Sequence, residues 1–371
     1  MPLKHLELRQ EHARNDEVAY ISFDRLLGGS APSLQHLSIR GFEYQELPSL
    51  LLSAPNLISL KMEDIRLACY MSPEAMVGAL AGLTKLRELT ITFLFFRIPR
   101  HHNAKGFQSL RSPTQAVFPA LTKLRIEAVN AYLENLINLI DAPRLDDLDV
   151  LCPKPDEDKE LRAGNLLQFI SQTETFKNAQ FRRAEVMLGR SHTSIVFDIP
   201  QDECQQTCLS LTVEGPMNRF YPFVDTVSHV ANWLGQLVMM LSDVQSLSIM
   251  DYREWTIVGR DHVLKNINWL LFLRLFPAVE VLHVRGGIVK HITSVLENIP
   301  EEMVTQVLPA LELLWTKKGK ESVDRFLSLR KRYGRPVVVV KRHYEFIETL
   351  NPRQLKLRKS RKVHPGVCEK T

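Results

Sequence analysis

Long hydrophobic runs are absent from this 371-residue sequence, and cysteine is scarce. The most apolar stretch, Trp269 to Phe276, is interrupted by Arg274 and closed by Pro277, so it is too short to span a bilayer. The opening segment, residues 1–7, already carries charge, which predicts that no signal peptide is present. The five cysteines are odd in number and scattered, as expected of reduced thiols, and no Asn-X-Ser/Thr sequon occurs. These absences predict a cytoplasmic or nuclear protein without a membrane segment.

Most of the chain has almost no excess of charge of either sign. The net charge is +5, but residues 353–371 contain seven Lys/Arg and one Glu, which gives +6. The other residues therefore carry 40 basic and 41 acidic side chains, which gives −1. With 45% apolar residues overall, the chain can bury a core without disulfides or metals. We expect a folded body over residues 1–350 and a basic, disordered tail over 351–371, because the tail has too little apolar area to offset the entropy of ordering.

A short pattern recurs along the folded part: apolar, two variable residues, apolar, one variable residue, apolar. Its copies are Leu3/Leu6/Leu8, Leu34/Leu37/Ile39, Leu57/Leu60/Met62, Leu86/Leu89/Ile91, Leu121/Leu124/Ile126, Leu145/Leu148/Val150, Val244/Leu247/Ile249, Val279/Leu282/Val284 and an incomplete Leu311/Leu314. Several copies follow a turn with proline, at Pro55, Pro119, Pro143, Pro277 and Pro309. The last two apolar positions lie two residues apart, which is the periodicity of a β-strand.

Segments with helical spacing separate the copies. They are 74–83, 132–140, 166–173, 230–241, 263–276, 288–299 and 322–333, and the Ser72-Pro73-Glu74 sequence is a good helix start. A repeated strand, turn and helix is the leucine-rich-repeat unit, so the predicted fold is an α/β leucine-rich-repeat-like solenoid. Its parallel sheet should line the concave face, with the helices outside.

Two features depart from a regular repeat of this kind. The third apolar position moves from 8 to 39, 62, 91, 126 and 150, in steps of 31, 23, 29, 35 and 24 residues. The place of the usual Asn or Cys is taken by Phe42, Ile65, Leu94, Val129 and Tyr252. Residues 151–243 fit the pattern worst: segments 184–188, 194–199 and 209–213 resemble short strands, which are either decayed repeats or an inserted hairpin.

Several longer motifs resemble those of fungal F-box/leucine-rich-repeat-like proteins, over roughly residues 34–340. They are FPALTKL from Phe118, YLENL from Tyr132, IDAPRL from Ile140, LQFI from Leu167, FPAVEVL from Phe276, VTQVLPALE from Val304 and GRPVVV from Gly334. In that family an F-box docks on the adaptor of a cullin–RING ubiquitin ligase, and the repeats present a substrate. No F-box is seen here, since the first repeat begins at Leu3, so the resemblance implies the partner-binding half.

Motifs for catalysis, nucleotides or metals are weak, and we expect no enzyme activity and no cofactor. Cys204 and Cys208 with His192 lack a second ligand pair, and ordinary thiols account for them better than zinc. His101-His102 suit a solvated loop, and the group Asp225, Ser228 and His229 suits helix capping better than a triad. Gly28-Gly29-Ser30, Gly286-Gly287 and Lys317-Lys318-Gly319-Lys320 lack the frame of a phosphate loop.

The function predicted from these observations is a non-catalytic protein-interaction scaffold, whose partner binds the outward positions of the repeat strands. The candidate partner-binding residues are Arg9, Arg40, Lys61, Glu63, Arg125, Glu127, Asp149, His283 and Arg285. An equally simple account is that five of them, Lys61, Glu63, Arg125, Glu127 and Asp149, pair across neighbouring strands. The alternative function is a nuclear or nucleic-acid-associated protein that works through its basic tail, with Arg353, Lys356, Arg358, Lys359, Arg361 and Lys362.

Overall fold

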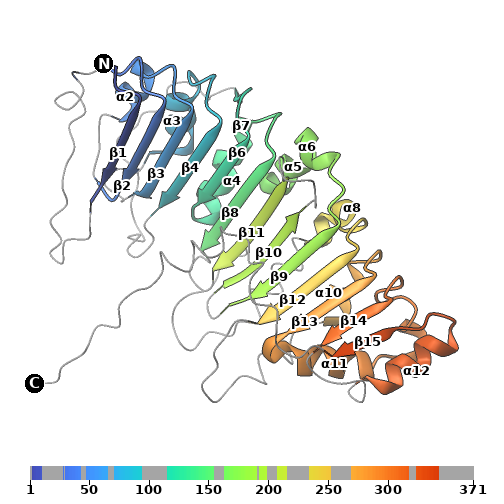
Figure 1. The fold of residues 1–371 in the computed structure, drawn as a ribbon. Helices are drawn as coiled ribbons and strands as arrows, with labels where there is room; N and C mark the ends of the chain where they lie inside the picture. The colour runs from blue at the N-terminus through green and yellow to red at the C-terminus, as the bar shows by residue number, and fades with distance from the viewer. Residues whose placement is uncertain are drawn as a thin grey trace, which may run out of the picture.

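The protein is an α/β structure built on a large, mostly parallel sheet (Figure 1). This computed structural model describes residues 2–10, 28, 30–42, 47–65, 71–93, 115–153, 163–189, 192–198, 207–214, 234–251, 269–316 and 323–341. The main sheet has 13 strands in the order β1-β2-β3-β4-β6-β8-β11-β10-β9-β12-β13-β14-β15. The basic tail predicted to be disordered lies outside the described residues.

Every copy of the repeated pattern forms a strand of this sheet. These strands are β1 (His5–Arg9), β2 (His36–Arg40), β3 (Ser59–Ile65), β4 (Glu88–Phe93), β6 (Lys123–Glu127), β8 (Asp147–Pro153), β12 (Ser246–Asp251), β13 (Val281–Arg285) and β14 (Leu313–Thr316). The sequence did not predict β15 (Val338–Lys341), which ends the described sheet, nor the short pair β5 (Ala116–Val117) and β7 (Ile140–Asp141). The pattern therefore locates nine strands of the main sheet correctly.

The same local structure leads into successive strands. Every pattern-predicted strand from β2 on is preceded by the same turn. In this turn the amide of the first apolar position donates a hydrogen bond to the carbonyl three residues earlier, as Leu57 does to Ala54 and Leu121 to Phe118. Two consecutive amides then share one carbonyl of the preceding strand segment: Ile58 and Ser59 both bond the oxygen of Gln35. The proline of most of these turns fixes the backbone angle that such a turn needs.

The described helices lie along one face of the sheet (Figure 1). They are α2 (Leu47–Ser53), α3 (Pro73–Leu80), α4 (Asn130–Asn138), α5 (Gly164–Gln172), α6 (Glu174–Lys177), α8 (Val238–Leu241), α10 (Trp269–Arg274), α11 (Val289–Glu297) and α12 (Asp324–Arg332), with 3-10 turns η3 (Gly286–Ile288) and η4 (Glu301–Met303). As predicted, Ser72 caps α3, accepting a hydrogen bond from the Ala75 amide at 3.2 Å. Helices α2 and α6 were not predicted. Among the described helices, none has the length and hydrophobicity that crossing a bilayer requires.

The core lies between these helices and the inward residues of the strands. From β2 on, the inward positions of the repeated pattern, such as Leu60, Met62, Leu124 and Ile126, are fully buried. They form one continuous apolar cluster with helix residues such as Leu136, and Leu6 and Leu8 of β1 are partly buried against it. Burial of this row, rather than helix propensity, holds the helices on the sheet.

Glutamates of one helix cap the start of the next one. The Glu134 carboxylate in α4 accepts the amides of Asn165 and Leu166, at 2.8 and 3.1 Å, where α5 begins. In the same way Glu297 at the end of α11 accepts the amides of Arg325 and Phe326 in α12. Neither α5 nor α12 has a side-chain cap of its own, so these carboxylates satisfy amides that a helix start leaves unpaired.

Residues 151–243 contain an antiparallel meander that lies between β8 and β12 in the sheet, and we call it the inserted meander. Its strands β9 (Arg183–Leu188), β10 (His192–Asp198) and β11 (Cys208–Glu214) match the three predicted segments. They enter the sheet in reverse order, so β11 pairs parallel with β8 and β9 pairs parallel with β12, while β10 is antiparallel to both neighbours. The expectation of an all-parallel sheet is wrong at β10.

Candidate protein-binding face

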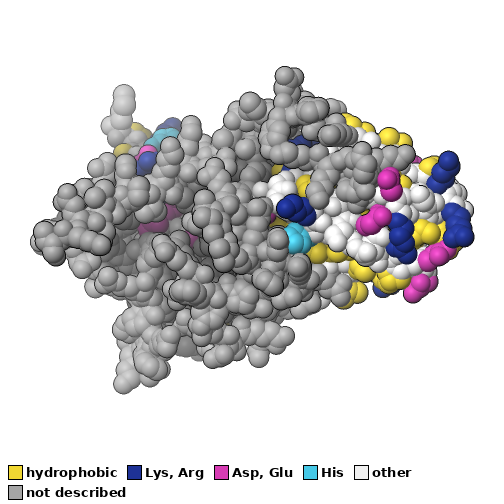
Figure 2. Space-filling model, turned by 90° about the horizontal axis from the view of Figure 1, so that it is seen from below, with side chains coloured by type: hydrophobic (Ala, Val, Ile, Leu, Met, Phe, Trp, Pro, Cys, Tyr) yellow, Lys and Arg dark blue, Asp and Glu magenta, His cyan; other side chains and the backbone are white. Residues whose placement is uncertain are grey.

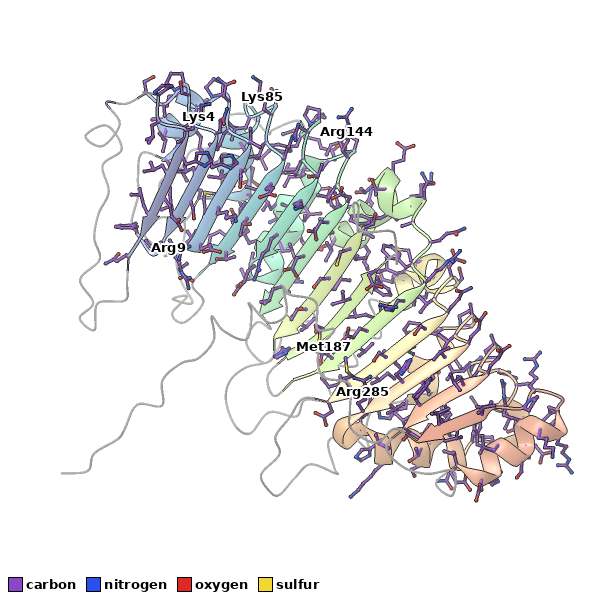
Figure 3. The ribbon with its side chains drawn as sticks, viewed as in Figure 1. Lys4, Arg9, Lys85, Arg144, Met187 and Arg285 are labelled. Atoms are coloured by element: carbon purple, nitrogen blue, oxygen red, sulfur yellow. The ribbon has the colours of Figure 1, made fainter. Side chains whose placement is uncertain are left out.

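The face of the sheet opposite the helices carries the outward residues of the strands, and we call it the open face. Because side chains alternate along a strand and parallel strands are in register, these residues form rows that cross the sheet. The middle row runs Glu7, Ser38, Lys61, Thr90, Arg125, Asp149, Ser210, Val196, Glu185, Ser248, His283, Trp315 and Val340. Figure 3 draws the side chains of the described residues along the strands.

The nine predicted partner-binding residues all lie on strands of this sheet. The register places Arg9, Arg40 and Glu63 side by side on β1–β3, and Lys61 and Arg125 on either side of Thr90. His283 and Arg285 lie far from them, on β13. Arg9 and Arg285 both stand at the carboxyl ends of their strands, at opposite halves of the sheet (Figure 3). The sequence thus placed the residues on strands, but they do not make one cluster.

Most charges on β1–β8, which we call the charged half, are paired with one another. Arg125 lies 3.6 Å from Asp149 on the neighbouring strand, and Lys123 lies 3.4 Å from Glu88. Arg9 forms an ion pair with Glu7 on its own strand. The pair of Arg125 with Asp149 fits the simpler account given above. Pairs of this kind on a protein surface contribute only about 0–1 kcal/mol each to stability.

Arg40 has the best-placed acidic partner in the charged half. The register of β3 and β4 shifts between Met62 and Ile65, and Asp64 there adopts a left-handed backbone with φ of 56°. This bulge turns the Asp64 carboxylate to Arg40, whose Nε donates a hydrogen bond of 2.7 Å to it. That hydrogen bond raises the pKa of the Arg40 guanidinium.

Two partly buried carboxylates lie at the centre of the open face, on the inserted meander. Burial raises the pKa of Glu185 on β9, and the nearby negative charge of Asp198 on β10 raises it further. Burial likewise raises the pKa of Asp198, although Arg183 lies 4.0 Å away and opposes the shift. One oxygen of each carboxylate is buried without a hydrogen-bond partner. These groups are costly for the fold when they are ionised.

Apolar and aromatic side chains replace charges on the strands that end the sheet. Val281, Leu313 and Val338 lie in register on β13, β14 and β15, and His283, Trp315 and Val340 form the next row. We call these six residues the apolar strip. The rings of His283 and Trp315 are stacked, with centroids 5.7 Å apart and planes 10° apart. All six are at least partly exposed, and the exposed fraction of Val338 is 61%.

The apolar strip was missed by sequence reasoning, although part of its signal was present. The pattern stopped at Leu314 and so assigned no outward position to Trp315. Val338 and Val340 lie in a segment matched only as a family motif, because a run of valines has no alternation to show which side chains face outward.

Only part of the weak motifs for chemistry falls within the described residues. His192 and Cys208 stand at opposite ends of the β10–β11 pair, roughly 20 Å apart at 3.4 Å per residue. Among the described residues, no group of three or more His, Cys, Asp or Glu side chains is placed to hold a metal ion. Gly286 has φ of 78° and lies against the Asp251 carbonyl, so it serves a close backbone approach. The motif residues outside the described part of the chain include Cys204, His101, His102, Asp225, Ser228, His229 and residues 317–320, together with the six basic residues of the tail.

No protein-family model and no curated protein sequence matches the chain. Two solved structures resemble part of it. One is T. thermophilus RuvC in complex with a Holliday junction substrate, with 12% identity over 41% of this chain and 95% of that chain and a TM-score of 0.20. The other is Thermus thermophilus RuvC, with 11% identity over 41% and 96% and a TM-score of 0.21. At so low a TM-score the likeness carries no argument about this protein.

Proposed function

We propose that this protein is a divergent leucine-rich-repeat-like solenoid that binds a protein partner on its open face and has no catalytic role. The observation that carries the proposal is the 13-stranded sheet, whose outward side chains form continuous rows on the face opposite the described helices. A broad, registered surface of polar, charged and aromatic side chains offers contacts to a protein rather than a pocket for a small molecule.

The repeated local structure supports the solenoid part of this proposal. From β2 on, each predicted copy contributes one strand preceded by the same hydrogen-bonded turn. The shared carbonyl recurs from Lys4, which accepts the amides of Gln35 and His36, to Glu280, which accepts those of Glu312 and Leu313. Each unit buries its apolar row against its neighbours, as stacked repeats do. The resemblance to F-box/leucine-rich-repeat-like proteins extends the proposal to a substrate-recognition part of a ubiquitin-ligase receptor.

Affinity purification with charge-reversal variants tests the proposal. One bait carries Lys61→Glu, Arg125→Glu and Arg285→Glu on the open face. The matched control carries Lys85→Glu, Arg144→Glu and Lys331→Glu, which lie on exposed turns and on α12 and change the net charge equally.

A partner retained by the wild type and the control, but lost by the open-face variant, is the expected result. The loss must recur with purified partner in a binary binding assay. A partner that is lost only by the control would place binding on the other surface and refute the proposal. Recovery of a cullin–RING adaptor together with the partner is expected for the ligase role, and its consistent absence would count against that role.

A further inference from the structure

The charged half and the apolar strip of the open face differ in whether their side chains form ion pairs with one another. In the charged half, Arg125, Lys123 and Arg40 each have a carboxylate within 4.0 Å. A partner that binds there must replace these pairs, and the gain from doing so is small. Five of the six residues in the apolar strip, all except His283, carry no ionisable group. Burying its apolar area is therefore the larger source of binding energy on this face.

Trp315 is the side chain best suited to anchor a partner. Its indole is partly exposed and is held by its stack on His283, so little side-chain freedom is lost on binding. Leu313 and Val338, in register on neighbouring strands, extend an apolar surface beside it. A rigid aromatic ring surrounded by aliphatic groups is the arrangement that carries most of the energy in protein interfaces.

The chemistry of the partner follows from the charge beside the strip. Arg285 follows His283 by two residues on β13, is exposed, and makes no ion pair with any described carboxylate. Its charge acts at longer range on Glu185, whose pKa it lowers against the effect of burial. At this end of the molecule the basic and acidic side chains are interspersed (Figure 2). The partner is therefore selected by the single charge of Arg285 rather than by a large electrostatic field of one sign.

We propose that the apolar strip is the principal docking site of the open face. Its occupant is an extended peptide segment of a partner protein, with an aromatic or branched aliphatic side chain over Trp315 and an acidic side chain at Arg285. An extended segment fits because the two rows of the strip are separated by the two-residue spacing of a strand. This inference rests on the proposed function and adds to it which part of the open face binds the partner and which class of ligand binds there.

The test uses the full chain and a phage-displayed library of random dodecapeptides, whose selected members are then synthesised and measured by fluorescence anisotropy. Selected peptides are expected to combine an acidic residue with an aromatic or branched aliphatic one. Trp315→Ala should weaken their binding by about 30-fold and Arg285→Glu by about tenfold. Trp315→Phe, which keeps an aromatic ring on His283, should retain most of the affinity. Arg144→Ala, on an exposed turn away from the strip, should change it less than about twofold.

Other results would overturn the inference. They are enrichment of peptides without acidic residues, binding unaffected by Trp315→Ala, failure to enrich any peptide, and dimerisation of the chain that Trp315→Ala abolishes, since a second copy would then be the occupant. Selected peptides that lose affinity with Lys61→Glu and Arg125→Glu instead would overturn this inference and leave the proposed function standing. Peptides that bind equally well to every open-face variant would count against both.

Discussion

Replacement of Glu134 should reveal how far the stacked helices depend on one another. The Glu134 carboxylate accepts two backbone amides at the start of α5, at 2.8 and 3.1 Å, and the preceding Ala163 offers no cap of its own. Each hydrogen bond to a charged group contributes about 1.5–3 kcal/mol, and the loss of a helix cap costs about 0.5–2 kcal/mol. Because the site is only partly buried, we expect Glu134→Ala to lower the free energy of unfolding by about 2 kcal/mol.

Urea denaturation followed by circular dichroism measures that loss, and hydrogen exchange locates it. The amides of Asn165 and Leu166 should exchange faster in the variant than in the wild type, while those of α11 stay unchanged. Glu134→Gln, which keeps one acceptor oxygen, should fall between the two proteins. Glu312→Gln is the control, because this exposed carboxylate caps no helix, and it should change stability by less than about 0.5 kcal/mol. Equal stability of Glu134→Ala and the wild type would refute the reasoning.

Three further predictions concern single buried or strained positions, each measured by denaturation. Arg330 is 1% exposed and donates to the carbonyls of Pro309 and Leu311 at 3.2 and 2.8 Å. Arg330→Met should therefore lower the free energy of unfolding by about 3 kcal/mol, and an unchanged stability would show that water can replace the guanidinium. Both Gly286 and Gly334 have positive φ, but only at Gly286 would a Cβ come within 2.3 Å of the Asp251 carbonyl oxygen. Gly286→Ala should therefore lower the free energy of unfolding by well over the roughly 1 kcal/mol expected of Gly334→Ala, and equal losses would refute this. Because the pKa of Glu185 is raised, the folded state binds its proton more readily than the unfolded state. This group therefore favours folding below its ordinary pKa of 4.5, and that contribution is lost as pH rises through the raised pKa of the folded state. Glu185→Gln should therefore be more stable than the wild type at pH 7 and lose that advantage on acidification, and a pH-independent difference would contradict the sign.

The inserted meander shows where local pattern stops being informative. Its three strands were visible as short apolar alternations, but their reverse order in the sheet was not. Alternation records which side of a strand is buried, and Ala184, Val186 and Leu188 bury their side chains whether β9 pairs with β8 or with β12. The choice of neighbour depends on contacts far apart in the chain, such as Ser246 with Arg183.

The candidate site divides in the same way. The outward placement of Lys61, Arg125 and His283 could be predicted, because a strand alternates by its own covalent geometry. Whether an outward charge is available to a partner depends on its neighbour across the sheet, as Arg125 with Asp149 and Arg40 with the bulged Asp64 demonstrate. The same holds for the stack of His283 on Trp315, whose residues lie on separate strands.

By itself, the sequence determined the strands, the turns that precede them, most of the helices and the sides they bury, because each depends on residues a few positions apart. Only the tertiary structure decided the reversal of β9–β11, the capping of α5 and α12 by Glu134 and Glu297, and the contrast between the charged half and the apolar strip. These features arise where segments distant in the chain meet, and no periodicity within one segment encodes which segment will lie beside it.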